Sequence, residues 1–231
     1  MPRIMFSTES TGWESLAGEV IMNTITDCIV RNGQCNVMLT GGETAENLYT
    51  HLADNPEVSL KNINFYFGDE RCVSPTHKDS NYGMVMKSLF VKGMPYSSAI
   101  YRIKAEDNDL ESVAETYSKL LPSKIDVLLL GMGDDGHVAS LFPESDVYEK
   151  ECTTVIPVIG NKLPYKRISV TPKLISDSKE VFLLAKGKKK GKVLAKAMAE
   201  PGNYRKLPVC LALEATWLLD TDACRQILVI D

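Results

Sequence analysis

The sequence lacks the features that mark several large classes of protein. None of its 6 cysteines forms a CxxC pair, and its 3 histidines are far apart, without an HxH or HExxH motif. No segment approaches the ~20 apolar residues of a membrane span, and the N-terminus has no long apolar region typical of a secretory signal. A net charge of -4 gives no general affinity for nucleic acid or acidic membrane. We therefore expect a cytoplasmic protein with no metal site and no nucleic-acid or membrane partner.

The composition is that of an ordinary globular protein. The chain has 231 residues, of which 44% are hydrophobic and 24% are charged. This length suffices for one large α/β domain with a substantial core, and we interpret residues 1–231 as a single domain. Scattered cysteines are typical of a reducing cytosol rather than of a disulfide scaffold. The oligomeric state stays open between a monomer and a weak dimer.

Strand-like and helix-like segments alternate along the chain. Short apolar runs predict buried strands at residues 36–40, 63–67, 127–130 and 180–185. Helical spacing or capping residues predict helices at residues 13–31, 44–54, 81–90, 109–121, 171–176 and 191–199. Weaker patterns predict strands at residues 100–103, 153–158, 167–170 and 226–230, a helix opening at 138–142 and a helical turn at 214–219. The alternation predicts a mostly parallel, Rossmann-like α/β sheet with helices on both faces.

Residues that could bind a ligand directly follow the ends of the main predicted strands. A diglycine, Gly41 and Gly42, precedes Thr44 at a helix start, which suits an anion site as well as it suits a plain strand-to-helix turn. Arg71 follows the next strand, where its planar fork could bind phosphate or join a surface ion-pair cluster. The lysines at 186–190 form a solvated face, or one of them reaches a phosphate. If the strands are parallel, these ends meet along one edge of the sheet.

The remaining strand end is the segment DVLLLGMGDDGHVASLFPES, residues 126–145. His137 could be a capping or core histidine, or a general base, since histidine titrates near neutral pH. Asp135 or Asp69 could orient its ring. No GxSxG motif is present, and we interpret Ser140 as a helix residue rather than a nucleophile. A histidine beside basic groups suits a small phosphorylated substrate that undergoes proton transfer.

Four segments together resemble one known family. They are LTGGETAENLY, FGDERCVSPTHKDSNYGM, DVLLLGMGDDGHVASLFP and RISVTPKLISDSKEVFLLAKGKKK. All are similar to signature segments of the 6-phosphogluconolactonases in the glucosamine-6-phosphate isomerase/6-phosphogluconolactonase family, and the resemblance extends over residues 13–220. The first segment departs from the family pattern, because Glu43 and Ala45 stand where serine and proline are usual.

The resemblance implies a carboxylic-ester hydrolase with the NagB/RpiA/CoA-transferase-like version of the fold. The implied reaction is hydrolysis of 6-phospho-D-glucono-1,5-lactone to 6-phosphogluconate in the pentose phosphate pathway, with no cofactor. The implied catalytic residues are His137, as general base, and its partner Asp135. The implied substrate-binding residues are Gly41, Gly42, Thr44, Asp69, Arg71, Arg167 and Lys190, with Arg71 in the phosphate site.

Two other functions stay open at this stage. A glucosamine-6-phosphate deaminase/isomerase shares the fold and a similar GxGxDGH turn, although the continuation ASLFPES favours the lactonase. A sugar-phosphate-sensing domain without catalysis is the second alternative. Such sensing domains usually lie beside a helix-turn-helix segment, and this chain has no room for one.

Overall fold

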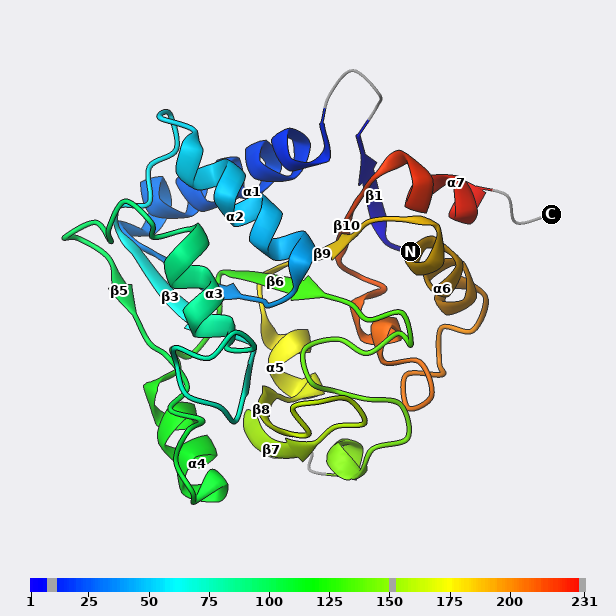
Figure 1. Cartoon of the computed structure of the whole chain (residues 1–231). Coiled ribbons are helices and arrows are strands. Elements are labelled where there is room, and N and C mark those ends of the chain that lie inside the picture. Colours follow the sequence, from blue (N-terminus) through cyan, green and yellow to red (C-terminus); the bar gives the residue numbers. More distant parts are fainter. Residues whose placement is uncertain (8–11, 150–152, 229–231) are drawn as a thin grey trace.

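The computed structural model describes residues 1–7, 12–149 and 153–228, and its centre is a sheet of parallel strands (Figure 1). In spatial order these are β1 (Arg3–Phe6), β10 (Thr216–Leu219), β9 (Glu180–Ala185), β6 (Val127–Gly131), β2 (Cys35–Leu39), β3 (Ile63–Phe67) and β5 (Ala99–Ile100). The middle strands are buried along most of their length. Their sequences are mostly apolar, with one asparagine in each of β2 and β3, because both faces of a parallel sheet are covered.

Helices cover both faces of this sheet. On one side lie α1 (Trp13–Asn32), α2 (Glu43–Asp54) and α3 (Asn81–Ser88), and on the other lies α5 (Pro172–Asp177) with a second sheet (Figure 1). The other helices are α4 (Leu110–Leu120), α6 (Lys188–Ala199), α7 (Thr221–Leu228) and the short 3-10 helices η1 (Asp146–Glu149) and η2 (Pro208–Ala212). The predicted Rossmann-like class is therefore confirmed. No helix in the described ranges is long and apolar enough to cross a membrane.

The order of the strands creates a switch point between β2 and β6. From β2 the chain proceeds to β3 and β5, and it then returns to β6 and continues in the opposite direction to β9 and β10. Because crossovers between parallel strands are right-handed, this reversal places successive helices on opposite faces. Open α/β sheets bind ligands beyond the carboxyl ends of the strands at such a point.

The second sheet is antiparallel and adds side chains to the same edge. Its strands are, in spatial order, β4 (Asp69–Arg71), β8 (Lys166–Val170) and β7 (Val155–Ile159). The register pairs Arg71 directly with Arg167. The strands predicted at residues 153–158 and 167–170 are thus present as β7 and β8, but they belong to this separate antiparallel sheet and not to the parallel one.

Three predicted elements are wrong. Residues 138–142 form no helix: Ala139 has a φ of 49°, and Val138 makes isolated bridges to Met132 and Leu141. Residues 214–219, predicted as a helical turn, contain strand β10 instead, because their apolar end pairs with β1 on one side and with β9 on the other. The predicted strand at 226–230 lies partly in α7, which ends at Leu228, and its last residues are outside the described ranges. Strand β1 was not predicted.

Candidate active site

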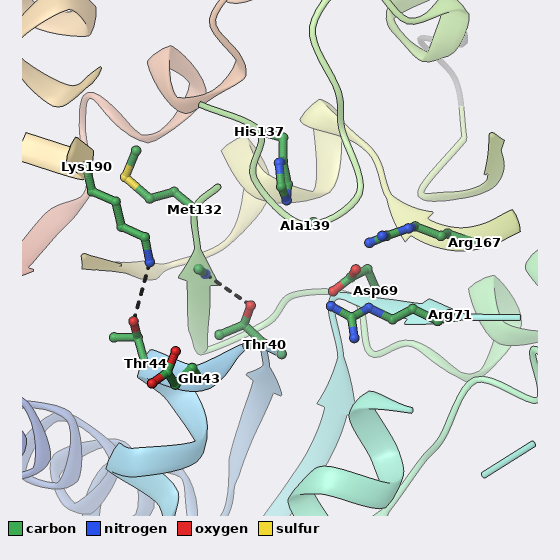
Figure 2. Close-up of a pocket in the computed structure, with 13 residues that line it drawn as sticks. Thr40, Glu43, Thr44, Asp69, Arg71, Met132, His137, Ala139, Arg167 and Lys190 are labelled. Atoms are coloured by element: carbon green, nitrogen blue, oxygen red, sulfur yellow. Dashed lines mark hydrogen bonds between the residues drawn. The ribbon is translucent and has the colours of Figure 1, made fainter. Parts of the chain in front are cut away.

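A pocket opens at the switch point, beyond the carboxyl ends of β2, β3 and β6 (Figure 2). It brings together segments that are up to 150 residues apart in the chain, from Thr40 to Lys190. The lining residues are Thr40, Gly41, Gly42, Glu43, Thr44, Asp69, Arg71, Gly131, Met132, His137, Ala139, Arg167 and Lys190. Every residue that the sequence suggested for the site is among them except Asp135, which contacts the pocket through His137.

His137 and Asp135 form a hydrogen-bonded pair in the glycine turn after β6. Nδ1 of His137 lies 2.5 Å from Oδ1 of Asp135. A carboxylate accepts only, so Nδ1 carries the proton and Nε2 remains as the acceptor. The ring also packs against Phe142, with 4.7 Å between ring centroids. Figure 2 shows His137 facing the pocket between Lys190 on one side and Arg71 and Arg167 on the other.

The surroundings of Asp135 favour its ionised form. Burial alone would raise the pKa of this carboxyl group, but the hydrogen bond with His137 and the nearby Lys162 ammonium outweigh burial and lower the pKa. The Lys162 Nζ atom lies 3.1 Å from Oδ2 of Asp135. Asp135 is therefore an anion at neutral pH, and it can stabilise a positive charge on the His137 ring.

Two arginines face one side of the pocket. Arg71 donates from Nη1 to the main-chain oxygen of Asp79 at 2.8 Å, whereas its buried Nε makes no hydrogen bond to the described residues. Arg167 lies over the Phe142 ring at 5.2 Å. Burial lowers the pKa of Arg167, and the negative charge of Asp69 opposes this shift. The pair of guanidinium groups can bind an anion in a bidentate manner.

Asp69 is the buried carboxylate between these arginines and the β6 turn. Its Oδ2 accepts a hydrogen bond from the Ser140 hydroxyl at 2.7 Å, and its Oδ1 accepts one from Asn81 Nδ2 at 3.1 Å. The bond to Ser140 helps to explain why residues 138–142 do not continue as a helix, since the segment turns inward to reach Asp69. Ser140 is buried and does not line the pocket, and it is not the helix residue that the sequence predicted.

Lys190 supplies a positive charge on the opposite side. Its Nζ lies 3.4 Å from Oγ1 of Thr44, in the first turn of α2. Burial lowers the pKa of Lys190, and Asp134 and Glu43 oppose the shift. Gly42 precedes α2 with a φ of 95°, a conformation that glycine adopts without strain. The first amides of α2 have no acceptor within the helix, so this side also suits an anion.

Two other lysines of this run contact residues that do not line the pocket. Lys186 pairs with Glu14 at 2.5 Å and lies near the Trp13 ring. Lys189 is almost fully exposed and only 4.0 Å from an oxygen of Asp134. The solvated interpretation of this run holds for Lys189, whereas Lys186 is only 30% exposed and pairs with Glu14. Among residues 186–190 only Lys190 lines the pocket.

Sequence reasoning missed several members of the site. Thr40, Gly131, Met132 and Ala139 line the pocket without ionisable groups, so only their positions beside the glycine turns pointed to them. Thr40 also ties two strand ends together, because its Oγ1 accepts the Gly131 N–H at 3.0 Å. Lys162 gave no signal at all, since it lies in the loop between β7 and β8, away from any parallel strand end.

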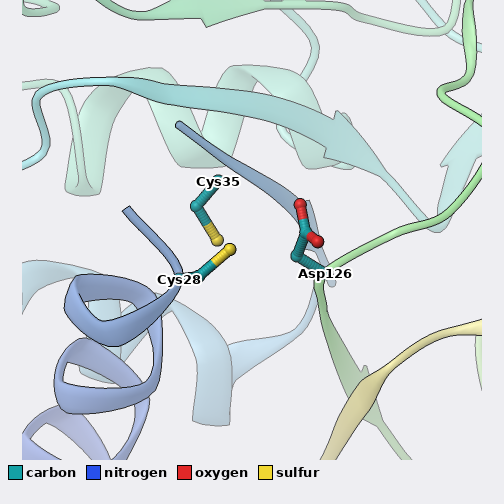
Figure 3. Close-up of side chains that lie close together, drawn as sticks. All are labelled: Cys28, Cys35 and Asp126. Carbon is teal, nitrogen blue, oxygen red and sulfur yellow. The ribbon is translucent and has the colours of Figure 1, made fainter. Parts of the chain in front are cut away.

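A second cluster of potential ligand atoms lies at the other end of the sheet (Figure 3). Cys28, Cys35 and Asp126 each place one sulfur or oxygen atom within 4.8 Å of the others. The Asp126 oxygens already bind Lys179 Nζ at 2.6 Å and the Asn36 N–H at 2.9 Å. Burial raises the pKa of the Cys35 thiol, which keeps it protonated. These contacts favour a structural cluster rather than a metal centre.

The fold and the pocket define an α/β protein with a histidine–aspartate pair and flanking cations at the switch point. The sequence profile described as glucosamine-6-phosphate isomerases/6-phosphogluconolactonase matches residues 10–219. The chain belongs to this family.

Individual relatives agree with this placement. A 6-phosphogluconolactonase of Haemophilus influenzae is 32% identical over 97% of this chain and 99% of its own length. A solved structure of 6-phosphogluconolactonase from Trypanosoma brucei superposes with a TM-score of 0.84 at 25% identity, covering 98% of this chain and 99% of that one. A monomeric glucosamine-6-phosphate deaminase superposes with a TM-score of 0.81 at 21% identity over 97% and 99% of the two chains, which shows a common fold.

Proposed function

We propose that this chain is a 6-phosphogluconolactonase, which hydrolyses 6-phospho-D-glucono-1,5-lactone to 6-phospho-D-gluconate in the oxidative pentose phosphate pathway without a cofactor. Family membership and the lactonase relatives support the reaction. The observation that carries it is the 2.5 Å contact between His137 Nδ1 and Asp135 Oδ1 at the edge of a pocket with cations on two sides. A general base next to anion-binding groups is the arrangement that hydrolysis of a phosphorylated lactone needs.

In the proposed mechanism His137 acts as the general base. Its Nε2 takes a proton from a water molecule while the water oxygen attacks the lactone carbonyl carbon, C1. The carbonyl oxygen becomes an oxyanion, and main-chain N–H groups at the glycine turns stabilise it; one such donor is typically worth about 3 kcal/mol. The ring C–O bond then breaks, and the departing oxygen takes the proton back from the His137 ring to become the sugar hydroxyl. Asp135 stabilises the imidazolium throughout.

The other pocket residues are proposed to hold the substrate. Arg71 binds the phosphate group, and its unpaired Nε–H supports this role because the donor lacks an acceptor in the described residues. Lys190 and Arg167 supply further positive charge, while Asp69 orients Arg167 and accepts a substrate hydroxyl. Gly41, Gly42 and Thr44 contribute the main-chain donors and the hydroxyl of the α2 turn.

The first test is lactone hydrolysis. The substrate is generated in place from glucose 6-phosphate, and 6-phosphogluconate is followed with a coupled assay. We expect a rate well above spontaneous hydrolysis that falls by a factor on the order of 10²–10⁴ in His137→Ala, because a positioned general base contributes that much. His51→Ala is the matched control, since His51 lies on α2 and does not line the pocket.

Two outcomes would end the assignment. A His137→Ala variant with the full rate would remove the proposed base. No wild-type rate above background would redirect the work to glucosamine 6-phosphate as the substrate, and binding of a sugar phosphate without turnover would revive a sensing role.

The proposal also covers where and in what form the protein acts. We infer a cytoplasmic enzyme that works as one domain on a small molecule. The thiols of Cys28, Cys35, Cys72, Cys210 and Cys224 are free, as is usual in a reducing compartment. Cell fractionation followed by the lactonase assay tests the location, and activity confined to a secreted fraction would contradict it.

A further inference from the structure

A lysine outside the pocket contacts the far oxygen of the catalytic pair. Lys162 lies in the loop between β7 and β8, and its Nζ is 3.1 Å from Asp135 Oδ2. Asp135 therefore has one oxygen on His137 and the other on Lys162. The Oδ2 atom is buried and makes no hydrogen bond to the described residues. The Lys162 contact is therefore an ion pair, and the ammonium compensates the charge on this oxygen.

This contact differs from an ordinary surface ion pair. Lys189 and Asp134, one residue before Asp135 in the same turn, are 4.0 Å apart with side chains that are 86% and 59% exposed. Such exposed pairs contribute little. In the Lys162 pair the lysine side chain is 50% exposed, but the Asp135 side chain is only 25% exposed and its Oδ2 atom is buried. The carboxylate end of this pair is therefore screened less than a carboxylate in water is.

The loop that carries Lys162 is fastened to the pocket by Arg167. The Nε of Arg167 donates to the main-chain oxygen of Pro164 at 2.9 Å, and Nη2 donates to the oxygen of Lys162 at 3.4 Å. The same guanidinium group lies over Phe142, and the His137 ring packs against that phenylalanine. These contacts form a closed ring. Arg167 holds the loop, Lys162 of the loop contacts Asp135, Asp135 bonds to His137, and His137 packs on the phenylalanine under Arg167.

We propose that Lys162 is a positioning residue for the hydrolysis: its ammonium fixes Asp135 so that Oδ1 holds His137 Nδ1–H and Nε2 faces the pocket. This inference rests on the proposed function. The titratable groups near Asp135 are Asp134 and His137 on its own turn, Lys162 on the β7–β8 loop and Arg167 on β8. Of these, Lys162 is the cation in direct contact with the oxygen that His137 leaves free. Removing the ammonium leaves a buried carboxylate oxygen without compensation, so Asp135 turns towards water and the His137 ring loses its fixed orientation.

The kinetic test compares Lys162→Met with Lys162→Arg. We expect Lys162→Met to lower kcat for the lactone by between tenfold and a hundredfold, as a small displacement of a reacting group does, with KM changed by less than about twofold, because Lys162 does not line the pocket. Lys162→Arg keeps the positive charge and should restore most of kcat. Lys166→Met is the control: it removes the same charge from an exposed position on β8 of the same hairpin, and its kcat should equal the wild-type value.

A second measurement needs no activity. The short His137–Asp135 bond should give a low-field Nδ1–H proton resonance in the NMR spectrum, which is assigned by its loss in His137→Ala. We expect this resonance to shift or broaden in Lys162→Met and to persist in Lys162→Arg and Lys166→Met. Thermal unfolding of each variant separates these effects from a loss of folded protein.

The outcomes separate the two proposals. An inactive wild-type protein refutes the lactonase assignment, while the resonance still decides whether Lys162 positions the pair. With an active wild type, a Lys162→Met variant that matches Lys166→Met in kcat overturns the positioning role. A loss of kcat that Lys162→Arg fails to restore overturns the role of the charge.

Discussion

At the scale of single residues, Gly133 shows how closely the turn after β6 fits around the hydrogen-bonded pair of His137 and Asp135. A Cβ atom added to Gly133 would overlap the His137 ring and would lie 2.5 Å from Asp135 Oδ1. Main-chain bonds close the turn at the same place, with Gly133 N–H donating to His137 O at 2.9 Å. The glycine therefore serves the approach of the two side chains, and no other residue type leaves room for them.

The first prediction follows from this contact. Gly133→Ala should lower kcat by a factor on the order of 10², because the methyl group displaces the His137 ring from its bond to Asp135. The unfolding temperature should change far less than kcat. Gly202→Ala is the control, since a Cβ at Gly202 meets nothing within 4 Å. Steady-state kinetics and thermal unfolding of both variants check this, and equal kcat values in the two would contradict the steric argument.

Sequence reasoning located those site residues that directly follow strands. His137, Arg71 and the Gly41–Gly42 pair were found because buried apolar runs are visible in a sequence and parallel strands end at one edge. Lys162 was not found, because its contact with Asp135 depends on how an antiparallel hairpin folds over the sheet.

At the scale of elements, Glu70 links strand β4 to the start of helix α3. It is buried, and its two carboxylate oxygens accept the N–H groups of Asn81 and Tyr82 at 2.7 and 2.8 Å and the Ser80 hydroxyl at 3.1 Å. Burial raises the pKa of Glu70, and the main-chain hydrogen bonds partly offset this rise. Because Asn81 in turn holds Asp69, the cap of α3 also determines where the carboxylate in the pocket lies.

The second prediction concerns this cap. Glu70→Ala should lower the free energy of unfolding by about 2–4 kcal/mol, because it leaves the N–H donors at the start of α3 without acceptors in a buried place. Urea unfolding measures the change. The control is Glu46→Ala, which removes an exposed carboxylate from the first turn of α2 and should cost less than about 0.5 kcal/mol. Similar urea midpoints for the two variants would show that Glu70 is not the cap described here.

Local patterns predicted the elements well where the chain is regular, and they failed at residues 138–142 and near the end of the chain. Helix α1 begins at Trp13 and ends before Gly33 in the left-handed conformation, as its apolar spacing and terminal glycine indicated. Residues 214–219 were assigned the wrong structure, because the short apolar run of β10 is ambiguous until β1 and β9 are known to flank it. Tertiary pairing, which no local window contains, decides such segments.

At the scale of the whole molecule, strand β6 is bracketed by two carboxylates. Asp135 follows the strand beside the pocket, where it holds His137, and Asp126 precedes the strand at the opposite end of the sheet. Asp126 joins three central strands, since it accepts the N–H of Asn36, the second residue of β2, and pairs with Lys179, which directly precedes β9. Burial raises the pKa of Asp126, but Lys179 and Asn36 outweigh burial and lower it below the ordinary value of 3.8.

This lowered pKa predicts how stability depends on pH. A carboxylate that ionises more readily in the folded protein than in the unfolded chain binds fewer protons in the folded state. The stability that it contributes is fully present above pH 3.8 and is lost as the pH falls from there through its pKa in the folded protein. Wild-type protein should therefore lose stability steeply below about pH 4, and Asp135, whose pKa is also lowered, should contribute in the same direction.

The variant Asp126→Asn isolates the share of one carboxylate in that acid response. At pH 7 it should be less stable than the wild type, because the Asn36 N–H then donates to a neutral acceptor, a change worth about 1 kcal/mol, and the ion pair with Lys179 is lost as well. The difference should stay constant from pH 7 to pH 5 and shrink below pH 3.8, where the wild-type carboxylate takes up its proton. Urea midpoints measured across this range test the sign. A gap between the two proteins that widens in acid would mean that Asp126 ionises less readily in the folded state than in the unfolded chain, and its place as the link between the central strands would have to be given up.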